Sequence, residues 1–198
     1  NFTREFLAQT RRPEKPARFS HLDMVAIGSV AAASTSWAIL PQGAVAGWCL
    51  ILAGIVNLVR LSRWYGWHTW REPLVFVLHW GYGWLTLALF LLGCAALGVG
   101  LPKEDAVHAL TTGAVGVMTL GIMTRASLGH TGRQREAGPA TVAMYVLVTC
   151  GAMLRVFGPG TGLPYTLVLG CAAACWSGAY LLFALVYGPY LLRPSVDE

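Results

Sequence analysis

Six long apolar stretches, separated by short polar loops, constrain this chain more than any other feature. Each is about 18 to 28 residues long, which is enough to cross about 30 Å of hydrocarbon at 1.5 Å per residue. They lack the period-two alternation of strands and are too long for strands. We therefore predict an all-α fold, a polytopic transmembrane helical bundle of about six membrane-spanning helices. The stretches cover approximately residues 22–40, 44–61, 73–98, 106–128, 139–157 and 164–192.

Charge is scarce and unevenly placed along the chain. Charged residues are 12% of the 198 residues and hydrophobic residues 56%, whereas soluble domains carry about a quarter charged residues. When alternate loops are assigned to opposite sides of a membrane, only Lys103 and Arg155 of the fourteen Lys and Arg fall on one side. The positive-inside rule makes the other side cytoplasmic, so both ends of the chain are predicted to be cytoplasmic. No basic run is interleaved with aromatic residues, so the expected partner is the lipid bilayer and no nucleic acid.

The first twenty residues differ from the rest of the chain. Residues 1–20 are polar and basic, and we interpret them as a basic cytoplasmic tail or interhelical loop with a short interfacial helix near its start. Residues 21–198 then form the six-helix transmembrane domain. Because the chain begins with Asn1 and not with Met, we expect it to be part of a longer chain.

Two histidines, His79 and His108, lie inside the apolar stretches. An ionisable side chain within a membrane span is a functional hypothesis by default. Each imidazole could bind a metal, such as haem iron or copper. Equally, His79 could hydrogen-bond to a neighbouring helix, and His108 could be an interfacial residue in contact with water. Tyr82 shares the helical face of His79 and belongs to the same candidate site. Helix depth places the two histidines about 15 Å apart along the membrane normal, so they should not ligate one haem together.

The stretch from His108 to Arg133 ends in a polar turn. Arg125, His130 and Arg133 gather there, and they could bind a haem propionate or another anion. A snorkelling arginine and a solvated loop are the alternative interpretations. We expect Gly129 to end the helix.

The block HALTTGAVGVMTLGIMTRASLGHTGR, with RWYGWHTWREPLVFVLHWGYGW before it and NFTREF at the start, resembles the NnrS family. The resemblance implies an inner-membrane protein of bacteria that contains haem and copper and takes part in the response to nitric oxide and nitrosative stress, often beside denitrification. It also implies that this chain is the C-terminal half, so the N-terminal half and nitric oxide are expected partners. With this resemblance His79 and His108 become candidate metal ligands. The alternative function is a membrane transporter or channel whose histidines and glycines line a substrate path.

Overall fold

The computed structural model describes residues 2–10, 13 and 15–196, so Arg11 and Arg12 of the predicted basic tail lie outside the described residues. Six helical spans are long and apolar enough to cross a membrane, as predicted, and no strand occurs in the described part of the chain. A short helix, α1 (Phe2–Gln9), precedes them, as expected from the sequence. The spans are α2 (His21–Ile39), α3 (Ala44–Ser62), α4 (Pro73–Ala96), a continuous run made of α5 (Lys103–His108), a π-helical segment (Ala109–Val115) and α6 (Gly116–His130), then α7 (Pro139–Phe157) and α8 (Tyr165–Leu191).

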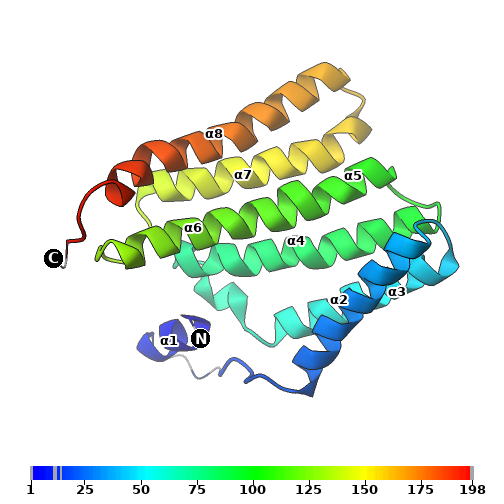
Figure 1. Cartoon of the computed structure of the whole chain (residues 1–198), viewed down its shortest axis with the longest axis horizontal. Coiled ribbons are helices and arrows are strands. Elements are labelled where there is room, and N and C mark those ends of the chain that lie inside the picture. Colours follow the sequence, from blue (N-terminus) through cyan, green and yellow to red (C-terminus); the bar gives the residue numbers. More distant parts are fainter. Residues whose placement is uncertain (1, 11–12, 14, 197–198) are drawn as a thin grey trace.

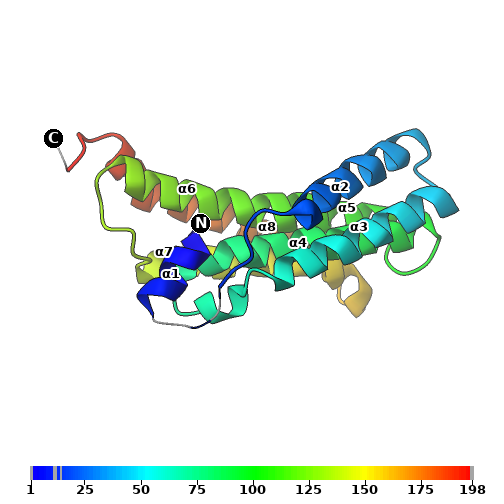
Figure 2. The same ribbon diagram turned by 90° about the horizontal axis from the view of Figure 1, so that it is seen from below.

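The spans lie side by side in a row. Figure 1 shows the order α8, α7, α6 and α4 across the molecule, with α2 and α3 crossing beyond α4. The pairs that pack closely include α7 with α8, α4 with α6, α3 with α4 and α2 with α3. Figure 2 shows α2 inclined away from the other helices toward one end, whereas α3 stays packed on α4. The helix α1, residues 192–196 and the loops 63–72 and 131–138 lie at one end of the spans, which we call the basic end. The loops after α2, α4 and α7 lie at the opposite end.

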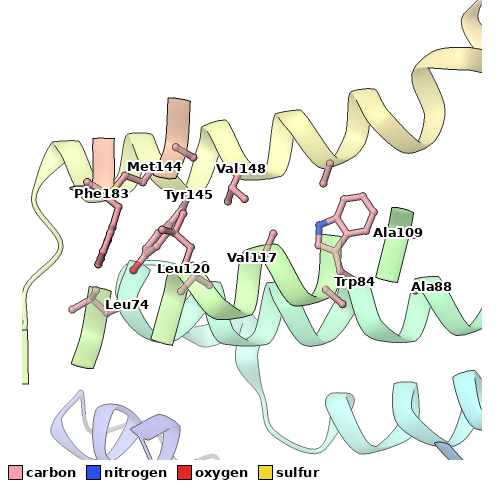
Figure 3. Close-up of a cluster of buried hydrophobic side chains, with 14 of the residues drawn as sticks. Leu74, Trp84, Ala88, Ala109, Val117, Leu120, Met144, Tyr145, Val148 and Phe183 are labelled. Atoms are coloured by element: carbon pink, nitrogen blue, oxygen red, sulfur yellow. The ribbon is translucent and has the colours of Figure 1, made fainter. Parts of the chain in front are cut away.

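The larger hydrophobic core lies where α4, the π-helical segment, α6, α7 and α8 meet. Leu74, Trp84, Val117 and Met144 are among its buried side chains (Figure 3). Large apolar side chains such as Leu185 on α8 instead remain exposed on the outside of the row. Helices that are apolar all round suit a hydrocarbon surrounding, in which outward-facing side chains meet lipid.

Glycines set the close approach of α4 and the α5–α6 run. A Cβ atom on Gly121 would lie 2.7 Å from Cγ1 of Val77, and the ring of Trp84 covers Gly113 in the same way. Small residues at such positions let membrane helices approach closely. These contacts also fix the register, since Val77 lies opposite Gly121 and Trp84 opposite Gly113.

The end of α6 differs from the sequence prediction. Gly129 was expected to end the helix, but α6 continues to His130 and Gly132 adopts the left-handed conformation, with φ of +67°. Thr131 donates its hydroxyl hydrogen to the carbonyl oxygen of Ser127 at 2.7 Å and so closes the last turn. Glycine adopts positive φ without steric cost, which explains why Gly132 reverses the chain.

Candidate functional site

A hollow of about 560 Å³ opens beside His79, toward the basic end of the spans. We call it the His79 hollow. Its walls come from distant parts of the sequence, including the N-terminal segment, the end of α3 and the first halves of α4 and α6. Its volume lies in the range of about 300 to 1,000 Å³ that is typical of cofactor and small-molecule sites. The residues that matter most for its chemistry are Thr3, Arg60, Trp64, His79, Tyr82 and Met118.

The imidazole of His79 is held from two sides. Its Nε2 atom forms a hydrogen bond with the hydroxyl of Thr3 at 2.9 Å, in which either group donates according to the tautomer. The backbone of Gly66 packs against the ring so closely that a Cβ there would lie 2.7 Å from the Cδ2 atom of His79. The Nδ1 atom is buried and has no hydrogen-bond partner among the described residues. Buried polar atoms are rarely left unpaired, which makes this nitrogen a candidate ligand atom.

A charged network forms the polar wall of the His79 hollow. Asp23 accepts a hydrogen bond from Nε of Arg60 at 2.8 Å, and Nη1 of Arg60 donates to the hydroxyl oxygen of Tyr82 at 2.8 Å. Tyr82 in turn donates to Oδ1 of Asn57 at 2.5 Å. The ring of Trp64 lies 4.9 Å from the guanidinium carbon of Arg60 and 4.8 Å from the ring of Tyr82. The network fixes Tyr82 and Arg60 rigidly at the edge of the hollow.

A second hollow, of about 300 Å³, adjoins the first and shares its walls Leu78 and Ile122. We call it the basic hollow. Arg125 and His130 of α6 line it together with Arg135 of the following loop. The structure thus brings two of the predicted anion-binding residues into one hollow, next to the one that contains His79 and Tyr82.

Arg133 lies elsewhere. Its guanidinium carbon stacks 4.2 Å from the ring centre of Tyr190 on α8, and its Nη1 donates to the carbonyl oxygen of Thr131. Arg133 lines neither the His79 hollow nor the basic hollow. Its contacts fasten the α6–α7 loop to the end of α8.

His108 lies at the other end of the spans. The register of α4 against the α5–α6 run places it level with about residue 90, about eleven residues or about 16 Å from His79, in agreement with the separation expected from the sequence. Nearby, Nη1 of Arg155 donates to the carboxylate of Asp105 at 2.7 Å. Nδ1 of His108 is buried without a partner in the described part of the chain, and the π-helical segment starts directly after it. Such π-helical insertions occur frequently at functional sites.

Sequence reasoning missed several residues of the His79 hollow. Thr3 lies 76 positions before His79, and Gly66 lies in the loop before α4, so no helical periodicity links them to His79. The sequence identified Arg60 only as one of the Lys and Arg on the predicted cytoplasmic side, although an arginine and Asp23 near the ends of two spans were a possible signal for a charged network. Within the described residues no three His, Cys, Asp or Glu side chains gather as a metal site.

Comparison with known proteins identifies one family. The family model described as NnrS protein matches residues 1–195, which is nearly the whole chain. No curated protein and no solved structure matches. With six apolar spans and this match, the chain is a multi-pass membrane protein that belongs to the NnrS family, a family linked to the response to nitric oxide.

Proposed function

We propose that this chain is a haem-binding membrane protein of the nitric oxide response and that the His79 hollow holds the haem. The observation that carries the proposal is the imidazole of His79 in the wall of a hollow of about 560 Å³, with a buried Nδ1 atom that has no partner among the described residues. This single histidine is sufficient in principle, because a porphyrin supplies four nitrogen ligands and the protein can supply one axial histidine. Bound haem would supply an iron centre able to bind nitric oxide.

The residues around the hollow suit a flat, largely apolar group. Trp64, Met118 and Ile122 form apolar walls, whereas Tyr82 and Arg60 form a polar edge. When Nε2 of His79 donates its hydrogen to Thr3, Nδ1 presents a lone pair, and a metal-binding histidine usually donates its other ring N–H in this way. Thr3 and Gly66 would then orient the ring.

The proposal also covers copper and the second histidine, His108. We propose His108 as a ligand of a separate centre, because its separation from His79 is several times the distance of about 4 Å between the two axial atoms of one haem. Copper would require further ligands, because no group of three His, Cys, Asp or Glu gathers among the described residues.

The test is haem content in the full chain, purified in detergent. We expect a Soret band that His79→Ala removes and that shifts when nitric oxide is added to the unmodified protein. His108→Ala should leave this band unchanged, and His21→Ala, at the exposed start of α2, is the matched control. If His79→Ala keeps full haem content while the protein remains folded, the assignment of the hollow is wrong. Substrate flux in liposomes without any bound metal would favour the transporter alternative.

We also propose the bacterial inner membrane as the location, with the basic end in the cytoplasm. The charge asymmetry of the loops supports this orientation. Reporter fusions after residue 100 and after residue 135 test it, since the first should report the periplasm and the second the cytoplasm. The reverse pattern would overturn the orientation.

A further inference from the structure

The basic hollow combines a cationic rim with an apolar wall. Arg125, His130 and Arg135 form the rim, and Leu78, Ile122 and Ala126 form the wall. Ile122 has 54% of its surface exposed on the outside of the helices, where the acyl chains of a bilayer lie. The rim is within the last two turns of α6 and the loop after it, at the level of lipid headgroups. The hollow is thus polar where the headgroup of a phospholipid would lie and apolar where its acyl chain would lie.

Arg135 closes the rim by lying across the end of α6. A Cβ atom on Gly129 would approach its Nη2 at 3.3 Å and its Nε at 3.4 Å, so the guanidinium is in close contact with the last turn of the helix. Arg125 projects from the same turn region of α6, and both guanidinium groups line the hollow. Two arginines can bind a phosphodiester group through several charge-assisted hydrogen bonds.

Acidic residues lie on the other side of these two arginines. Glu5 and Glu72 line a smaller adjoining hollow of about 210 Å³ together with Arg125 and Arg135, but they do not line the basic hollow. The basic hollow itself is lined by Arg125, His130 and Arg135 and by no carboxylate among the described residues. Burial raises the pKa of Glu72, and this effect outweighs the lowering effect of Arg125.

We propose that the basic hollow is a binding site for an anionic phospholipid, with the phosphate on Arg125 and Arg135 and one acyl chain along Leu78 and Ile122. Basic pockets between membrane helices at the cytoplasmic face bind anionic headgroups in this way. The site adjoins the His79 hollow, with which it shares Leu78 and Ile122, but it does not include His79 and requires no metal.

The test uses the full chain in detergent, with thermal unfolding and native mass spectrometry as readouts. Phosphatidylglycerol should raise the unfolding temperature and remain bound, whereas phosphatidylcholine should do neither. Arg135→Gln lies in an exposed loop and should fold normally, and it should weaken phosphatidylglycerol binding about tenfold. Arg125→Gln should have a similar effect, whereas Arg193→Gln, an exposed arginine at the same end, should have none.

Three outcomes would overturn the proposal. One is a phosphatidylglycerol affinity of Arg135→Gln equal to that of the unmodified chain. Another is that inorganic phosphate alone gives the same stabilisation, which would indicate a site for free phosphate. The third is that both arginine variants lose haem but keep their lipid preference, because the hollow would then hold a carboxylate of the cofactor.

Discussion

Tyr82 offers the sharpest test of the charged network beside His79. Tyr82→Phe removes one oxygen and keeps the ring, so packing against Trp64 is retained. The oxygen accepts from Arg60 at 2.8 Å and donates to Asn57 at 2.5 Å. Asn57 is 1% exposed, and Tyr82 is the partner of its Oδ1 atom, so the substitution leaves this acceptor buried and unpaired.

The expected loss follows from these two hydrogen bonds. An unpaired buried acceptor costs about 1 to 3 kcal/mol, and a hydrogen bond to a charged group contributes about 1.5 to 3 kcal/mol. Hydrogen bonds between membrane helices are often weaker, at about 0.6 kcal/mol on average, and Arg60 keeps its ion pair with Asp23. We therefore expect Tyr82→Phe to lower the free energy of unfolding by about 2 kcal/mol.

The assay is reversible unfolding by SDS in mixed micelles, followed by circular dichroism. Tyr165→Phe is the matched control, because Tyr165 is 54% exposed and surface substitutions usually change stability by less than about 0.5 kcal/mol. Adding Asn57→Leu to Tyr82→Phe should recover part of the loss, since an apolar group then replaces the unpaired acceptor. A change below about 0.5 kcal/mol for Tyr82→Phe, or no recovery in the double variant, would refute the network.

Three further substitutions test other parts of the structure. Gly66→Ala should displace the imidazole of His79, because the new Cβ would overlap the ring; we expect a smaller Soret band at unchanged helix content, and an unchanged band would contradict the packing. Asp105→Asn should cost about 1.5 to 3 kcal/mol in SDS unfolding, since it removes the charged partner of the partly buried Arg155, and adding Arg155→Leu should reverse part of this loss. Glu72→Gln tests pH dependence: because burial raises the pKa of Glu72 in the folded chain, the carboxyl group contributes stability below its ordinary pKa, and this contribution is lost as the pH rises through the raised value. Unfolding measured between about pH 4 and about pH 8 should show a smaller loss of stability with rising pH for Glu72→Gln, and identical profiles would exclude this role.

Local sequence patterns were sufficient to predict the six spans and most of the residues at which they begin and end. Apolar length alone indicates a membrane helix, and Pro73 and Pro139 begin helices because their missing N–H is not needed in the first turn. The exception at Gly129 has a local cause, because the hydroxyl of Thr131 extended the helix by bonding to Ser127. The depth of a residue in the membrane follows from its position along its own helix. The distance between His79 and His108 along the membrane normal could therefore be predicted from sequence.

The composition of the candidate sites was decided by tertiary structure. Thr3 reaches His79 across 76 positions of sequence, and Arg125 is joined by Arg135 only because the chain turns back at Gly132. Conversely, Arg133 is close to His130 in the sequence but packs on Tyr190 instead. The sequence by itself determined that this chain is a set of membrane-spanning helices with ionisable groups at two depths, because hydropathy is additive along the chain. Which side chains share a hollow depends on helix rotation and loop direction, and these are fixed by packing between distant segments.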